Sequence, residues 1–216
     1  MASQNQQLEN PAPPTLGYPT EVYERRHFNE NNGSLTIYFK KLASVLGSLF
    51  GPRGGRFMNT PHGAFQDSTD QTAASTTAAY AVTFNTTDFS NGVTIASNSR
   101  ITVADAGIWN LQFSIQFKNT SNDGQDVDIW FRKNGTNIDN SNSRFHLSQR
   151  KSAGDPSHLI AAMNFFVSMD SADYIEIMWR TTSTAVSLEH FSTSTSPTRP
   201  AVPSAIVTMS FVSNIT

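Results

Sequence analysis

Histidine and acidic side chains are the first places to look for chemistry, because they supply metal ligands, general acids and general bases. The sequence holds 5 histidines, and they are widely scattered along the chain. Metal-binding motifs place two ligands about two to five residues apart, a spacing that no pair of these histidines has, so no metal site is predicted. The chain also has no cysteine, which excludes disulfide scaffolds, zinc ribbons and thiol catalysis.

The most acidic stretch contains Asp123, Asp126 and Asp128. Its oxygen atoms could hold calcium, but their order is not that of an EF-hand loop, and a solvated turn entering a strand explains the stretch as well. Asp128 and Glu176 fall on exposed faces of predicted strands. They could pair as a general acid and base, but the distance between them does not follow from the sequence. We therefore expect no catalytic residue, no bound metal and no cofactor.

Glycine-rich and polar loops are further candidate binding sites. The segment 51–55 follows a predicted helix, whereas a phosphate-binding loop joins a strand to a helix. Ser, Thr and Asn make up about 30% of the chain, and this composition accounts for its Asn-x-Ser/Thr sequons. Neutral hydroxyls and amides near aromatic rings suit a carbohydrate ligand, and two loops have this composition: 137–142 and 181–184, beside Trp130, Trp179 and Phe191.

Charge and hydropathy exclude further classes of partner. The net charge is −2 with a pI near 6.2, and charged residues make up only 15% of the chain, against about 25% in an average domain. Without a basic cluster we expect neither nucleic acid nor an anionic membrane as partner. No apolar run is long enough to cross a bilayer, so no membrane insertion is expected. The first residues do not resemble a signal peptide, which predicts assembly in a cytoplasm.

Residues 1–33 are predicted to form an extended attachment arm. The first part, to about residue 20, is rich in Gln, Asn and Pro and has almost nothing to bury. The rest alternates aromatic with charged residues, a pattern more typical of a contact surface than of a core. The residues expected to make that contact are Tyr23, Arg25, Arg26 and Phe28, with Arg53 beyond the following helix.

A short amphipathic helix is predicted over 34–51, with Ser34 as its N-cap and a Gly-Pro stop at its end. Its apolar residues recur every three or four positions and form one seam. Because so short a helix is marginal alone, we expect it to pack on the same helix of neighbouring subunits or on a larger assembly. Packing across its own β-domain is the alternative. The seam consists of Leu35, Tyr38, Leu42, Val45 and Leu49.

After a turn-rich linker at 52–63, the apolar period becomes that of β-strands over 64–216. Residues 109–118 alternate between apolar and polar, and a second alternating strand leads to the hairpin signal Asn134-Gly135. The predicted fold is an all-β antiparallel sandwich of jelly-roll or immunoglobulin type, although the latter lacks its usual cysteines. Further strands are expected at 79–84, 100–103, 159–167, 174–181 and 205–212. Several of them carry apolar side chains on both faces, so the second face needs a cover.

The run Ala106-Gly107-Ile108-Trp109, followed by alternating apolar residues and later by Lys133-Asn134-Gly135, resembles a motif of C1q/TNF-like jelly-roll domains. With 85–89, 93–95, 99–101 and the closing 197–204, the region 63–214 is similar to C1q-like domains in virion structural proteins of tailed bacteriophages, notably marine and cyanobacterial ones. The segments 23–28 and 51–55 resemble the N-terminal attachment region of such proteins.

This resemblance implies a homotrimer of ten-stranded jelly rolls located in the virion, at the head, neck or tail. The N-terminal arm would bind other phage structural proteins, and the jelly roll would project outward without catalysing a reaction. A host-receptor or glycan-binding module of a tail or fibre is the alternative function, and an enzyme acting on polysaccharide is a third. The family's calcium sites have no residue-by-residue match here. The expected trimer interface joins the helix seam to an apolar second face at Trp130, Phe166, Tyr174 and Met178.

Overall fold

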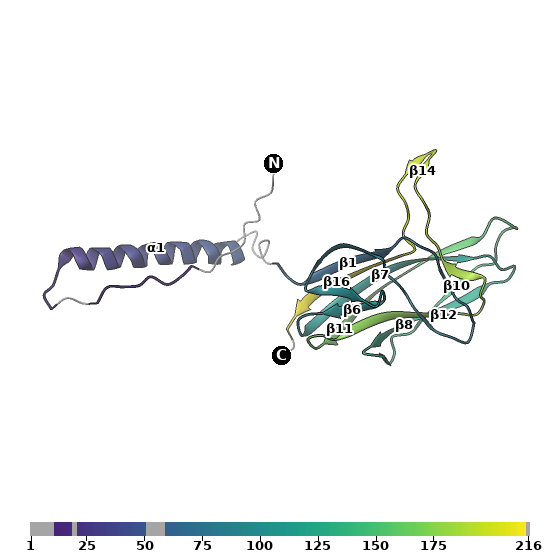
Figure 1. Cartoon of the computed structure of the whole chain (residues 1–216), viewed down its shortest axis with the longest axis horizontal. Helices are drawn as coiled ribbons and strands as arrows, with labels where there is room; N and C mark the ends of the chain where they lie inside the picture. Colours follow the sequence, from purple (N-terminus) through teal and green to yellow (C-terminus); the bar gives the residue numbers. More distant parts are fainter. Residues whose placement is uncertain (1–10, 19–20, 51–58, 215–216) are drawn as a thin grey trace. The chain divides into compact units, whose positions relative to one another are not determined.

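The computed structural model describes residues 11–18, 21–50 and 59–214. The chain divides into two compact units, Met1–Asn59 and Thr60–Thr216. The first unit contains the helix α1, and the strands all lie in the second (Figure 1). The predicted linker, apart from its last few residues, and the attachment residue Arg53 lie outside the described residues.

The helix α1 spans Arg25–Phe50, so it begins nine residues before the predicted N-cap Ser34. Ser34 instead lies inside the helix, where its hydroxyl donates to the Glu30 carbonyl oxygen at 3.0 Å. An ion pair between Arg26 and Glu30 at 2.8 Å supports the added turns. The earlier start corrects the expectation that the arm is extended as far as residue 33.

A short segment of the arm folds back against α1. The Gly17 amide donates to Asn31 Oδ1 at 3.2 Å, and a Cβ atom at Gly17 would come within 2.5 Å of the His27 ring. Only glycine therefore fits this close approach without a shift of the ring. Asn31 Nδ2 in turn lies 3.2 Å from His27 Nε2, a contact within α1 that positions the asparagine for its hydrogen bond with Gly17.

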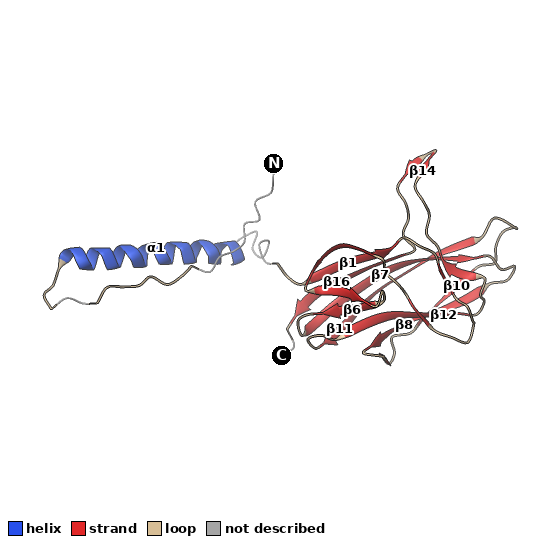
Figure 2. Cartoon of the chain, in the orientation of Figure 1, coloured by secondary structure: helices blue, strands red, loops and turns tan. Residues whose placement is uncertain are grey.

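The second unit is a sandwich of two antiparallel sheets (Figure 2). In the first sheet the order is β11-β7-β16-β1-β4, with β13 and β2 continuing beside the end of β7. In the second sheet it is β10-β8-β12-β6-β5, with β3 beside β12 and β9 beside β8. The strands are β1 His62–Asp67, β2 Gln71–Thr72, β3 Tyr80–Ala81, β4 Thr86–Asn91, β5 Val93–Ala96, β6 Arg100–Val103, β7 Gly107–Asn119, β8 Gln125–Lys133, β9 Thr136–Asn137, β10 Ser143–Leu147, β11 Ser157–Met169, β12 Tyr174–Thr181, β13 Val186–Leu188, β14 Ser194–Thr195, β15 Thr198–Arg199 and β16 Ala205–Ser213.

Alternating burial along the long strands builds the core between the sheets. In β7 every odd position from Gly107 to Asn119 is buried and every even position is more exposed, as the sequence period predicts. Phe131 of β8 and Trp179 of β12 also point inward, although burial does not alternate along these two strands, because Asp128, Glu176 and Met178 of the opposite face are buried as well. The large side chains that are almost completely buried include Trp109, Trp179, Phe65, Phe117 and Phe131. The predicted all-β fold with a single helix is confirmed.

Candidate functional site

The outer face of the second sheet carries a row of charged side chains across β10, β8 and β12. Arg144, Asp128 and Arg180 are direct cross-strand partners in that order. Arg144 donates to Asp128 from Nε at 2.8 Å and from Nη2 at 3.1 Å, and Arg180 Nε donates to it at 2.9 Å. The Asp128 side chain is only 8% exposed, so the guanidinium groups of Arg144 and Arg180 must offset the cost of removing its charge from water.

A second row on the same face surrounds Glu176, whose side chain is 4% exposed. Arg132, its cross-strand partner, donates to Glu176 Oε2 at 2.9 Å. The Ser99 hydroxyl donates to Oε1 at 2.9 Å, and Arg100 Nε lies 3.9 Å from the same oxygen. Both oxygens of each buried carboxylate are therefore already engaged with donors.

These contacts determine the electrostatics of the face. The hydrogen bond from Arg144 lowers the pKa of Asp128, burial opposes it, and the hydrogen bond from Arg180 lowers the pKa further. The pKa of Asp128 therefore lies below its ordinary value, and the carboxylate is ionised at neutral pH. An ionised carboxylate whose oxygens are occupied by arginines has no proton to donate. The contacts leave no oxygen of Asp128 or Glu176 without a donor, which does not favour the acid and base roles that the sequence suggested for them.

The residues expected to form an apolar interface are distributed over both sheets. Trp130 and Met178 are cross-strand partners on the second sheet, between the two charged rows. Tyr174 lies on the same sheet beneath Arg100, whose guanidinium carbon is 4.5 Å from the ring centre. Phe166, by contrast, lies on β11 in the first sheet. The expectation of one continuous apolar face was wrong, because alternation shows which residues share a face of a strand but not which sheet the strand joins.

Individual exposures refine this result. Met178 is 3% exposed, since β3 lies beside β12 at this position, so it offers almost no surface to a partner. Trp130 is partly exposed and donates from Nε1 to Asn137 Oδ1 at 2.8 Å. Trp179, one of the aromatic residues expected beside a glycan, is 1% exposed and belongs to the core. Phe166 is 56% exposed.

Exposed apolar side chains gather instead on the outer face of the first sheet. Ile160 and Phe166 of β11 are 61% and 56% exposed, and Ile206 of β16 is 40% exposed. Among the described strands β11 pairs with β7 alone, along all 13 of its residues. The strand contains no Lys, Arg, Asp, Glu or Pro. The first sheet therefore ends in a long edge without charge or proline of its own, and Lys133 Nζ donates to the Ser168 carbonyl oxygen near the end of that edge at 3.1 Å.

The helical unit also exposes apolar and aromatic side chains. The five predicted seam residues are half-buried, while Ile37, Phe39 and Leu46 remain exposed. Of the predicted attachment residues, Tyr23 and Phe28 are 74% and 51% exposed, with ring centres 6.2 Å apart. Arg25 is exposed as well, whereas Arg26 is paired with Glu30.

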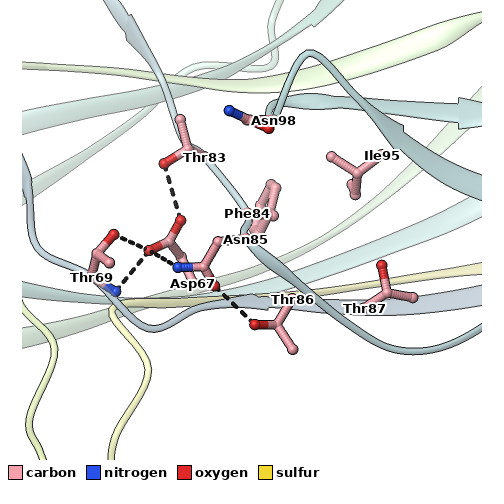
Figure 3. A pocket seen from close by; sticks show the side chains of 9 residues that line it. All are labelled: Asp67, Thr69, Thr83, Phe84, Asn85, Thr86, Thr87, Ile95 and Asn98. Carbon is pink, nitrogen blue, oxygen red and sulfur yellow. Dashed lines mark hydrogen bonds between the residues drawn. The ribbon is translucent and has the colours of Figure 1, made fainter.

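A pocket of about 540 Å³ lies where the end of β1 meets the start of β4 and the turn between β5 and β6 (Figure 3). Asp67, which is 2% exposed, forms its most deeply buried polar group. Sequence analysis did not identify this pocket, because its residues are far apart in the chain; the Asn-Thr-Thr triplet at its rim was the available signal. The lining residues are Asp67, Thr69, Thr83, Phe84, Asn85, Thr86, Thr87, Ile95 and Asn98.

Comparisons with known proteins add no identification. No protein-family model matches the chain, and no curated protein matches it significantly. Among the described residues, no group of three or more His, Asp or Glu side chains is arranged to hold a metal ion. No helix in the described part of the chain is long and apolar enough to cross a membrane.

Proposed function

We propose that the chain is a non-enzymatic structural protein that associates as a homotrimer through its own copies. The observation that carries this proposal is the outer edge of β11. Proteins usually protect a strand edge with charge, proline or a cover, and β11 has neither charge nor proline in its 13 residues. A second copy is the partner we infer, because Ile160, Phe166 and Ile206 add exposed apolar area on the same face.

The helix supports the same partner. With α1 beginning at Arg25, the seam spacing extends back to Phe28 and Asn31, which adds a heptad to the pattern that ends at Leu49. A heptad seam favours association with like helices. Leu35, Leu42 and Leu49 then occupy one core position and Tyr38 and Val45 the other, while the Asn31 side chain is engaged within the chain by Gly17 and His27.

The virion is the proposed location. Its support is the similarity of the residues around Trp109 to the C1q/TNF-like motif and the antiparallel jelly-roll arrangement in which they lie. The N-terminal arm, with its exposed Tyr23 and Phe28, would attach the protein to other phage structural proteins. The trimer would then present three β-sandwiches away from the attached arms. If each sandwich binds the same kind of target, the three contacts together bind more strongly than one.

Sedimentation velocity on the full chain tests the assembly. A mass near three times 23.7 kDa is expected, and a persistent monomer at micromolar concentration would contradict the proposal. Leu42→Asp should weaken association, with Lys41→Asp, an exposed neighbour, as the matched control. Phe166→Asp should also release monomers, whereas Thr102→Asp on the second sheet should not.

Particle incorporation tests the location. Deleting residues 1–24 leaves α1 intact, so the truncated protein should still associate but should be missing from purified phage particles when they are examined by mass spectrometry. Incorporation of the truncated protein at the level of the full chain would refute an attachment role for residues 1–24, which include Tyr23. Absence of the full chain from particles would refute the virion location itself.

A further inference from the structure

The Asp67 pocket combines hydrogen-bonding groups from three segments that are distant in sequence. Asp67 ends β1 and Thr69 follows it, residues 83–87 lead into β4, and Ile95 and Asn98 come from β5 and its turn. The backbone N–H of Phe84 donates to the Asn98 carbonyl oxygen at 2.7 Å, which joins two of these segments. The pocket is therefore built by the fold rather than by one flexible loop.

Asp67 fixes the direction of the hydrogen bonds on the pocket floor (Figure 3). A carboxylate only accepts, so each group beside it must donate. The Thr69 hydroxyl and backbone N–H and the Asn85 amide donate to Oδ1, and the Thr83 hydroxyl donates to Oδ2 at 3.1 Å. Because the hydroxyl hydrogens of Thr69 and Thr83 point toward Asp67, the two hydroxyl oxygens can only accept hydrogen bonds from a ligand.

The rim supplies complementary groups. The Thr86 hydroxyl donates to Asn85 Oδ1 at 2.9 Å and so also keeps only acceptor capacity. Thr87 and Asn98 are exposed, and within the described part of the chain their side chains make no hydrogen bond. They remain able to donate and accept. The pocket thus presents acceptors on its floor and adaptable groups at its rim, which suits a ligand carrying several hydroxyls.

Other classes of ligand fit less well. A cation would meet the hydrogens that point toward Asp67 Oδ1, because three donors already surround that oxygen. An anion would meet the Asp67 carboxylate, and no Lys, Arg or His lines the pocket. An apolar ligand would find little surface, since Phe84 is 3% exposed and only half-buried Ile95 could contact carbon atoms.

We propose that the Asp67 pocket binds a neutral sugar unit of a glycan, a function that goes beyond the assembly proposed above. A volume of about 540 Å³ lies within the range of small-molecule sites. The exposed rim residues leave room for the rest of the glycan chain to extend into solvent. Asp67 acts as a positioning residue, which orients the threonine hydroxyls, while Thr87 and Asn98 contact the sugar directly.

A glycan array that carries neutral and acidic oligosaccharides, probed with the full chain, tests this inference. We expect binding to neutral glycans, followed by titration of the best neutral monosaccharide with saturation-transfer NMR and a dissociation constant of about 1 mM. Binding restricted to acidic glycans, or no binding to any neutral glycan, would overturn the inference. The mass measurements on assembly are independent of this result.

Two substitutions locate the site on the protein. Thr87→Val removes a hydroxyl without altering any hydrogen bond within the described chain, and Asn98→Gly removes the amide while allowing the positive φ of 61° found there. Each should weaken binding about fivefold to tenfold without lowering the melting temperature. Thr94→Val, on β5 but outside the pocket, is the matched control. Equal affinity for all three variants and the unchanged protein would place the site elsewhere and refute the proposal.

Discussion

Replacing Asp128 by asparagine removes the negative charge between Arg144 and Arg180 with almost no change in shape. The carboxylate accepts three hydrogen bonds from these arginines, at 2.8, 3.1 and 2.9 Å. An asparagine keeps only one acceptor oxygen and turns an N–H₂ group toward a guanidinium. The charged row of β10, β8 and β12 then loses its central anion.

The expected cost follows from exposure. A hydrogen bond to a charged group contributes about 1.5–3 kcal/mol, but the Arg144 and Arg180 side chains are 60% and 42% exposed, so solvent screens both pairs. We therefore expect Asp128→Asn to lower the free energy of unfolding by about 2 kcal/mol in total. For a domain of this size the melting temperature should fall by about 4–8 °C, measured by circular dichroism at equal protein concentration.

The effect should depend on pH in a defined direction. Because the folded-state pKa of Asp128 is lowered, its contribution is fully present above the unfolded value of about 3.9 and is lost as pH falls through the folded pKa. Burial raises the pKa of Asp173, but hydrogen bonds from Asn134, the Asp170 backbone and Lys133 outweigh it, so Asp173 acts in the same window. Acid unfolding of the unchanged protein alone would therefore not isolate Asp128. The pH dependence of the free energy of unfolding must be compared between Asp128→Asn and the unchanged protein.

Denaturant titrations at pH 7, 5 and 3 check both expectations. The difference between the two proteins should be equal at pH 7 and 5 and smaller at pH 3. Asp126→Asn is the matched control. Asp126 lies on the same face of β8, its side chain is 34% exposed, and its ion-pair partner is the exposed His146, so its loss should cost less. An Asp128→Asn protein as stable as the original at pH 7, or a difference unchanged at pH 3, would refute the reasoning.

Three further changes test the fold. Phe113 is 4% exposed, so Phe113→Asp should lower the free energy of unfolding by about 4 kcal/mol or more and abolish the near-UV circular dichroism signal. Gln112→Asp, on the solvent-facing side of β7, should be tolerated. Gly135→Ala should lower the free energy of unfolding by about 1 kcal/mol in denaturant titrations, because φ is +82° there; no loss would contradict the turn. Shortening the exposed hairpin β14–β15, whose base is the bridge between Phe191 and Val202, should change the melting temperature by less than about 2 °C, and a larger drop would show that it supports the core.

Strong local patterns made much of the sandwich predictable. The strands β6 and β12 have the predicted bounds, and β7 buries the predicted face. The helix start was missed because Gly33 and the neighbouring asparagines are poor helix formers, although the Arg26–Glu30 pair, four residues apart, was a signal in the sequence. The contact of Gly17 with Asn31 is visible only in three dimensions. Two-residue strands such as β2 depend wholly on their partners and have no sequence period.

The binding surfaces were harder to predict than the strands. Asp67, Thr83 and Asn98 meet only because three segments converge at one end of the sandwich, and no spacing rule connects them. Trp130 and Phe166 are both aromatic residues within predicted strands, yet strand pairing places them in different sheets. Sheet membership is a long-range property, which explains why the expected apolar face was wrong. Asp128 and Glu176, expected on exposed strand faces, are buried by their ion pairs with arginines of neighbouring strands, which are also long-range contacts.

The bare edge of β11 also bears on how the protein can be produced. Under the proposed assembly, a newly translated chain folds first and associates with two others later. The rate at which its exposed edge is covered therefore depends on the concentration of folded chains. During that interval Ile160 and Phe166 lie beside the outer edge of β11, where the backbone groups that point away from β7 have no strand partner among the described residues. Expression at low temperature slows synthesis, which lengthens the time before assembly but lowers the concentration of unassembled chains that could aggregate. The yield of soluble protein would show which of these two effects is larger.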